Sequence, residues 1–177
     1  MRVVRYSVAA SLDGYIAGEH GEFDWIPDDP TVDFEAIFAR VDTVLLGRHS
    51  YEVMRGTAGP SPWASSTRVY VFSRTMRPEE HPGVNVVADD EAGVVAALRA
   101  EEGDGEIWLF GGGELFGSLL AVGQVDRVEV TVVPVLLGGG VPLLPPGGPR
   151  TALTLIDTRR YPSGMVSLIY SVDDADR

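Results

Sequence analysis

The chain has 177 residues, a length typical of one domain that buries about two-thirds of its unfolded surface, and we expect a single domain over residues 1–177. A hydrophobic content of 45% argues against disorder, and a net charge of −12 argues against nucleic acid or an anionic membrane as a partner. The sequence contains no cysteine, which excludes disulfides and thiolate chemistry, and no apolar run reaches the ~18 residues of a membrane span, so we expect a cytoplasmic protein.

The chain is expected to begin with a strand over Val3–Ala10, followed by a long loop rich in Gly, Asp and Pro. This loop carries Phe23 and Trp25 and ends near Asp29. Loops of about 20 residues inside a compact domain are commonly functional. Trp25 therefore either lines a substrate pocket or covers the edge of the core.

Asp29 and Pro30 predict the start of a helix, because Asp is favoured at the N-cap and Pro at the first helical position. The apolar stripe of this helix is formed by Phe34, Ile37, Phe38 and Val41. Asp33 lies one turn before Ile37, so its carboxylate borders the buried face. Asp33 either binds or protonates a substrate or is an ordinary acid favoured by the helix dipole.

A short apolar strand over Thr43–Leu46 runs directly into a helix start that contains Gly47, Arg48, His49 and Ser50. Cations in the first turn of a helix are repelled by the positive end of the helix dipole. An anion bound between these cations and the helix end removes this repulsion. Arg48 therefore indicates an anion site, with a solvated surface residue as the alternative.

Two later strands end in a similar way. Arg68–Phe72 is followed by Ser73 and Arg74, and Glu106–Phe110 is followed by Gly111–Gly113 and a new helix. Glycines permit close backbone approach, and the unpaired N–H groups of a helix start bind anions. In open α/β sheets ligands bind outside the carboxyl ends of the strands, so these ends predict one shared site. The alternative is that the glycines only turn the chain.

The last third of the chain has a different pattern of expected elements. Strands are expected over Val125–Pro134, Thr151–Asp157 and Met165–Val172, with no helix between them. An alternation of strands and helices that ends in three strands predicts an α/β fold with a mostly parallel mixed sheet and an antiparallel C-terminal strand.

Common cofactor and catalytic motifs are absent. The glycine run fails G-x-G-x-x-G because Phe116 occupies the last glycine position, and no P-loop or G-x-S-x-G motif occurs. The three histidines are isolated, so no metal site is predicted. The remaining pattern suits a phosphorylated nucleotide, and Arg48 together with Arg74 indicates more phosphate than NAD carries.

Five segments occur in the order seen in the dihydrofolate reductase-like superfamily, namely SLDGYIA, VLLGRHSYE, VYVFSRT, IWLFGGGELF and VDRVEVTVVPVLLGGGVPLL. The last segment especially resembles the C-terminal reductase domain of the bifunctional riboflavin-biosynthesis deaminase-reductase and its stand-alone relatives. The resemblance implies a dihydrofolate reductase-like three-layer α/β/α fold with NADPH bound across the strand ends. The zinc motifs of the deaminase are absent, so the resemblance implies reduction alone.

The resemblance also implies the residues that bind NADPH. The pyrophosphate and the adenosine phosphate would lie against Gly47, Arg48, His49 and Ser50, and the adenine ribose with its 2′-phosphate against Ser73 and Arg74. The turn under the pyrophosphate would be formed by Gly111, Gly112, Gly113, Glu114 and Leu115. The backbone beside the nicotinamide would be supplied by Ala9 and Ile16.

We predict an NADPH-dependent reductase that transfers hydride to a C=N or C=O bond of a small heterocycle. The leading substrate resembles 5-amino-6-(5-phosphoribosylamino)uracil of riboflavin synthesis, and the alternatives are a dihydrofolate or pterin reductase and a nucleotide-binding module without catalysis. Asp33 is the first candidate for orienting or protonating the substrate, and Asp13 is the second unless it only stabilises its turn. The basic residues expected to hold a ribose phosphate are not found. The apolar, glycine-rich stretch Val132–Leu144 favours a homodimer contact, with an ordinary buried sheet edge as the alternative.

Overall fold

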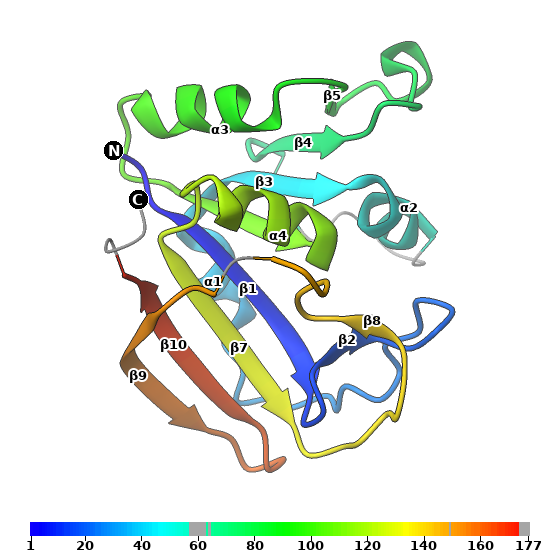
Figure 1. Cartoon of the computed structure of the whole chain (residues 1–177), viewed down its shortest axis with the longest axis vertical. Coiled ribbons are helices and arrows are strands. Elements are labelled where there is room, and N and C mark those ends of the chain that lie inside the picture. The colour runs from blue at the N-terminus through cyan, green and yellow to red at the C-terminus, as the bar shows by residue number, and fades with distance from the viewer. Residues whose placement is uncertain (57–62, 64, 149, 174–177) are drawn as a thin grey trace.

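The computed structural model describes residues 1–56, 63, 65–148 and 150–173 (Figure 1). The strands of the main sheet are β1 (Val4–Ser11), β3 (Val41–Gly47), β4 (Arg68–Phe72), β5 (Asn85–Val87), β6 (Glu106–Gly111), β7 (Arg127–Val133), β9 (Leu153–Arg160) and β10 (Val166–Val172). A second, two-stranded sheet pairs β2 (Tyr15–Ala17) with β8 (Val141–Pro142). The helices are α1 (Phe34–Ala39), α2 (Arg48–Gly56), α3 (Glu91–Ala100) and α4 (Gly113–Ala121), with a 3-10 turn at Pro78–Glu80.

The strand order of the main sheet is β5-β4-β3-β6-β1-β7-β10-β9. Neighbours from β5 to β7 are parallel, whereas β10 is antiparallel to both β7 and β9. This arrangement confirms the predicted mixed sheet with an antiparallel C-terminal strand. The parallel strands β1, β3, β6 and β7 all end at one edge, where Figure 1 shows α2, β2 and β8.

Helices cover both faces of the sheet and complete the predicted α/β/α layers. On one face, Tyr6 of β1 stacks on Phe116 of α4 with ring centroids 3.9 Å apart. On the other face, Phe38 of α1 lies 5.8 Å from Trp108 of β6, and Tyr51 of α2 packs against the same cluster. Successive side chains of a strand point to opposite faces, so the near-continuous apolar strands supply both cores.

Buried ion pairs close the sheet at the amino ends of its strands. The side chain of Arg2 is 2% exposed and pairs with Asp42 and, at 3.1 Å, with Glu101. Its Nε donates to the carbonyl of Gly105 at 3.0 Å, and its Nη1 donates to the carbonyl of Leu98 at 3.4 Å. Each nitrogen of this buried guanidinium therefore has an acceptor, as a buried charge requires.

The first helix begins later than the sequence predicts. The N-cap of α1 is Asp33, whose carboxylate accepts the N–H of Ala36 at 2.8 Å. The predicted start at Asp29 is wrong, because that buried carboxylate accepts the N–H groups of Thr31 at 2.9 Å and of Ser163 at 3.0 Å. Hydrogen bonds from Ser163 and Thr31 hold the pKa of Asp29 well below its usual value. Asp29 thus ties the long loop to the β9–β10 turn, a tertiary contact that local spacing does not reveal.

The strands β2 and β8 are missing from the prediction, because strands this short carry no periodic signal. Their position explains the glycine that begins α4. A Cβ added to Gly113 would lie 2.6 Å from the carbonyl oxygen of Pro142 and 3.0 Å from that of Leu143. Gly113 therefore lets β8 pack directly against the start of α4.

Candidate active site

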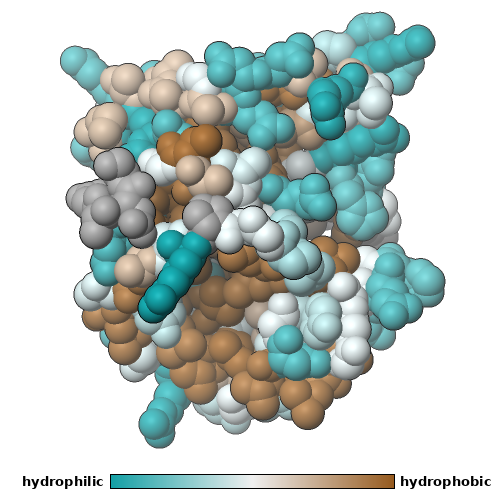
Figure 2. Space-filling model, in the orientation of Figure 1, coloured by the Kyte–Doolittle hydropathy of each residue, from teal (hydrophilic) through white to brown (hydrophobic). Residues whose placement is uncertain are grey.

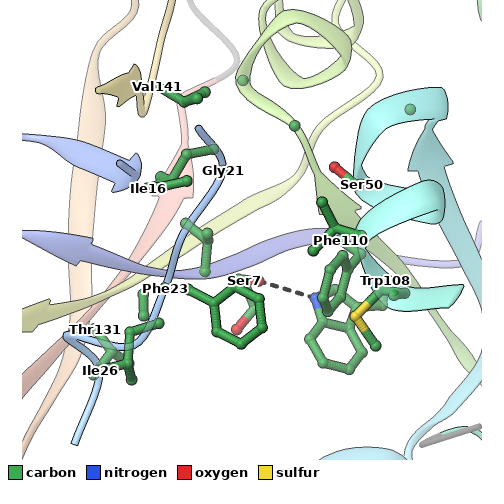
Figure 3. Close-up of a pocket in the computed structure, with 18 of the residues that line it drawn as sticks. Ser7, Ile16, Gly21, Phe23, Ile26, Ser50, Trp108, Phe110, Thr131 and Val141 are labelled. Carbon is green, nitrogen blue, oxygen red and sulfur yellow. Dashed lines mark hydrogen bonds between the residues drawn. The ribbon is translucent and has the colours of Figure 1, made fainter. Parts of the chain in front are cut away.

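A cleft of about 940 Å³ opens at the carboxyl ends of β1, β3 and β6 and along β7 (Figure 3). Ligand sites span roughly 300–1,000 Å³, so this cleft has room for a large cofactor or for a cofactor with a small substrate. The loop between β2 and α1 forms one wall. The predicted cofactor residues that line the cleft are Ala9, Ile16, Gly47, Arg48, His49, Ser50, Gly112, Gly113, Glu114 and Leu115. The fold thus gathers segments that are far apart in the sequence.

Two strand-to-helix turns meet at one end of the cleft. A Cβ added to Gly47, which ends β3, would lie 3.6 Å from the backbone nitrogen of Gly112, the N-cap of α4. Gly112 caps α4 without a side-chain hydrogen bond, and the peptide bond between Gly111 and Gly112 is cis. Gly111 itself is not part of the lining. Adjacent helix starts present unpaired N–H groups and positive dipole ends to the same space, which favours an anion.

Arg48 links this turn to the end of β4. Its Nη1 donates to Thr75 Oγ1 at 2.6 Å, and its Nε pairs with Glu52 Oε1 at 2.7 Å. The Arg48 side chain is 51% exposed, so water screens its ion pair and an incoming anion can compete for the guanidinium. Thr75 and Glu52 therefore hold the guanidinium at the cleft.

Ser73 and Arg74 lie in a smaller neighbouring hollow of about 300 Å³, not in the main cleft. Phe72 and Glu91 line both spaces, so the two are contiguous. Ser73 Oγ accepts the N–H of Met76 at 3.1 Å, and the exposed Arg74 forms no ion pair or hydrogen bond with the described residues. The hollow therefore offers a cation without a partner beside Arg48.

The far half of the cleft is aromatic. Figure 3 shows Phe23, Trp108 and Phe110 beside the open space, with Phe23 contributed by the long loop. The Trp108 indole Nε1 donates to the carbonyl of Ser7 at 3.0 Å, which fixes the ring against β1. Trp63 packs edge-on against Trp108 with centroids 5.7 Å apart. These rings form an apolar surface suited to a flat ligand.

Carboxylates also line this half of the cleft, namely Asp28 and Asp29 of the long loop and Glu129 of β7. Glu129 of β7 lines the cleft, its side chain is 13% exposed, and its Oε2 accepts from Arg5 Nη1 at 3.3 Å. Arg5 also pairs with Glu106 at 2.9 Å. Burial lowers the pKa of Arg5, and both carboxylates oppose that shift. Sequence reasoning missed Glu129, although polar residues alternate with valines along β7, a strand that needs apolar residues on both faces.

The two predicted acids do not lie in the cleft. The carboxylate of Asp13 accepts the N–H groups of Leu137 at 3.1 Å and of Gly138 at 2.7 Å. Hydrogen bonds, foremost from Ser11 and then from Gly138, lower the pKa of Asp13 to about 2, which opposes proton donation near neutral pH. Asp33 is exposed, caps α1 and is absent from the lining. The geometry supports a structural role for both residues.

The long loop lines the cleft through different residues from the one predicted. Trp25 does not line the cleft, and its Nε1 donates to the carbonyl of Glu22 at 3.2 Å within the loop. Phe23 and Ile26, on either side of Trp25, supply the wall instead. Of the two aromatic side chains that the sequence marks in this loop, Phe23 lines the cleft and Trp25 does not, because a loop without periodicity does not reveal which side chains point inward.

Two further observations concern the described residues. They contain no group of three or more His, Cys, Asp or Glu side chains that could hold a metal ion. No helix that they form is long and apolar enough to cross a bilayer.

The fold and the cleft agree with a comparison of the sequence with known families. A model of the RibD C-terminal domain family matches residues 2–167. The chain belongs to this family. It is similar to the uncharacterised protein YyaP of Bacillus subtilis strain 168, with 32% identity over 179 residues that cover 96% of this chain and 94% of that protein.

Comparison with solved structures supports the same family and fold. A crystal structure from Shewanella sp. PV-4, of a protein assigned by its name to riboflavin biosynthesis, matches with a TM-score of 0.83 and 29% identity over 98% of this chain and 99% of that one. Dihydrofolate reductase from Enterococcus faecalis, complexed with NADP(H), matches with a TM-score of 0.65 and 19% identity over 97% of each chain, a likeness of fold. These likenesses confirm the superfamily and fold predicted from the sequence.

Proposed function

We propose that this protein is an NADPH-dependent reductase of the riboflavin-biosynthesis type, which transfers hydride to a C=N or C=O bond of a small heterocycle. The observation that carries the proposal is the meeting of the Gly47 and Gly112 turns at one end of a cleft whose other half is aromatic. Membership of the RibD C-terminal domain family supports a reductase. The NADP(H) complex of the structurally similar dihydrofolate reductase supports the choice of cofactor.

The residues present fit such a cofactor. The backbone turns at Gly47 and Gly112 would hold the pyrophosphate, because neither carries a Cβ that would keep it at a distance. Arg48 and Arg74, which has no partner among the described residues, would hold the 2′-phosphate of the adenine ribose. Ala9 and Ile16 would flank the nicotinamide, which supplies the hydride. The protein would contribute position and exclusion of water by its aromatic wall.

Titration with NADPH tests the proposal. Trp108 lines the cleft, so its fluorescence and the melting temperature should both change on binding. A ligand at about 100 times its Kd stabilises the folded state by about 2.7 kcal/mol, which is readily seen as a higher melting temperature. If saturating NADPH changes neither quantity, the proposal fails.

Turnover then separates the enzyme from a binding module. Oxidation of NADPH should be followed with 5-amino-6-(5-phosphoribosylamino)uracil and with dihydrofolate as the two substrates. Oxidation in the presence of either one supports a reductase and shows which ring is accepted. Binding of NADPH without oxidation in a broad set of heterocycles would instead support a nucleotide-binding module without catalysis.

We also propose a homodimer through Val132–Leu144. Its support is the 68% exposure of Leu136 and the apolar surface that Figure 2 shows on the lower part of the molecule. Light scattering should report twice the monomer mass, and Leu136→Glu should return the protein to a monomer with its fold intact. A monomeric wild-type protein at micromolar concentration would reject the homodimer.

A further inference from the structure

The two halves of the cleft differ in charge. Among the described residues that line it, the basic side chains are Arg48 and His49, and both belong to the start of α2. The wall formed by β1 and β7 carries Ser7, Glu129 and Thr131 instead. Phosphate groups are bound by cations and backbone N–H groups. Within the described part of the chain, the substrate half of the cleft therefore has no basic side chain that would bind a phosphate.

Glu129 is the charged group of that wall. Its Oε2 accepts from Arg5 at 3.3 Å, whereas Oε1 is not fully buried and has no hydrogen-bond partner among the described residues. An ionised carboxylate is an acceptor and never a donor. Because Glu129 lines the cleft, Oε1 is an acceptor available to a ligand there.

Arg5 holds this carboxylate in place. The Arg5 side chain is 3% exposed and lies between Glu129 and Glu106, and Glu106 is also 3.9 Å from Arg127. Arg40 is a further cation near Arg5, so the carboxylates of this network do not outnumber the cations and Glu129 does not need another cation from a ligand. A neutral ligand with N–H donors satisfies Oε1 without adding charge.

A flat ring is the shape that the surroundings favour. Ser7 is the direct partner of Glu129 in the β1–β7 register, and the carbonyl of Ser7 holds the indole of Trp108. The carboxylate and the indole are therefore anchored at the same position along β1. A planar heterocycle can lie against the aromatic wall while its edge reaches Glu129.

We propose that Glu129 is a specificity-determining residue that binds the N–H edge of a flat, unphosphorylated heterocycle, such as the ring N–H and adjacent amine of a 2-amino-4-oxopyrimidine ring. The assignment rests on the proposed function, because this ring would be the hydride acceptor. It chooses the dihydrofolate or pterin alternative over the leading substrate, because 5-amino-6-(5-phosphoribosylamino)uracil carries a ribose phosphate and a 2-oxo group. Arg5 acts as the positioning residue for the carboxylate.

A matched pair of rings tests the assignment. Pterin presents the adjacent amine, and lumazine carries a carbonyl oxygen at the same place. Calorimetric titration of the NADPH-saturated protein should give at least about tenfold tighter binding of pterin, as a charge-assisted hydrogen bond implies. Glu129→Gln should abolish this preference and leave lumazine binding within about twofold. Equal affinity of the wild-type protein for the two rings would overturn the proposal.

Glu106→Gln is the matched control, because it also removes a carboxylate from Arg5 but lies outside the cleft lining. This variant should keep the preference for pterin. If it loses the preference as fully as Glu129→Gln, the effect comes from disturbance of Arg5 and the assignment to Glu129 is wrong. A melting curve of each variant shows that it is folded.

Two measurements separate the failure of this inference from the failure of the proposed function. NADPH should bind the wild-type protein and both variants with equal affinity, and absence of binding to the wild type rejects the function itself. Ribose 5-phosphate, added to the NADPH-saturated protein, should not displace pterin. Displacement would reveal a phosphate site and reject the unphosphorylated substrate class.

Discussion

The amino and carboxyl ends of the parallel strands differ in how their polar groups are paired. At the amino ends, each guanidinium nitrogen of Arg2 has an acceptor, and Arg99 pairs with Asp126 at 2.7 Å. At the carboxyl ends, Gly112 caps α4 without a side chain, and Arg74 has no partner among the described residues. Buried polar groups are normally satisfied within the protein. We therefore expect stability to reside mainly at the amino ends, here called the closed end, and binding at the carboxyl ends, here called the open end.

The largest effect is expected from opening the closed end. Arg2→Ala should lower the free energy of unfolding by about 3 kcal/mol, near the lower limit for breaking a buried ion pair, because Asp42 and Glu101 are half exposed and regain water. Urea denaturation measures this loss. Arg159→Ala, which removes an exposed pair with Asp157, should cost less than about 1 kcal/mol. Similar losses for the two variants would contradict a special role of the closed end.

Gly113 tests whether the open end also has structural parts. Gly113→Ala should cost about 2 kcal/mol, because its Cβ would clash with the carbonyl oxygen of Pro142 at 2.6 Å. The measurements are urea denaturation and NADPH titration, and both should show a loss. Gly56→Ala is the control, since its Cβ meets nothing within 4 Å, and it should leave the stability unchanged or raise it. A Gly113→Ala variant as stable as the wild type would show that β8 moves away from the added methyl group without loss of stability.

Arg48→Ala should affect binding and not stability. We expect NADPH affinity to fall by about 1.5 kcal/mol, roughly tenfold, and NADH affinity to fall less, because NADH lacks the 2′-phosphate. Fluorescence titration with both cofactors measures the difference. Arg74→Ala should behave alike, and Arg159→Ala should bind both cofactors as the wild type does. An equal loss of NADPH and NADH affinity would reject the 2′-phosphate assignment.

The smallest effect concerns pH. The pKa of Asp13 is about 2 in the folded protein, below its ordinary value of 3.8, so folding favours the ionised form. Its contribution to stability is complete above about pH 4 and is lost as the pH falls toward 2. Asp13→Asn should therefore lower the melting temperature at pH 6 and have little effect at pH 2. A melting-temperature difference that is constant over this range would exclude ionisation of Asp13 as the cause.

The glycine turns could be predicted because their signal is local. Gly47 and Gly112 each follow an apolar strand and precede a helix, and parallel strands end at the same edge of a sheet. Asp33 and Asp13 were chosen by the same local reasoning, and it failed for them. Their carboxylates bind backbone N–H groups that cap a helix or hold a loop. A sequence does not distinguish an acidic residue that accepts backbone N–H groups from one that contacts a ligand.

The sequence by itself determined most strands of the main sheet, its antiparallel end and the turns suited to an anion, because each follows from periodicity or turn chemistry within a few residues. The tertiary structure decided that Phe23 and not Trp25 lines the cleft, and that Glu129 reaches it beside Trp108. These placements depend on strand order and register between residues far apart in the chain. A one-residue change in register would turn Glu129 to the other face, and no local pattern fixes that choice.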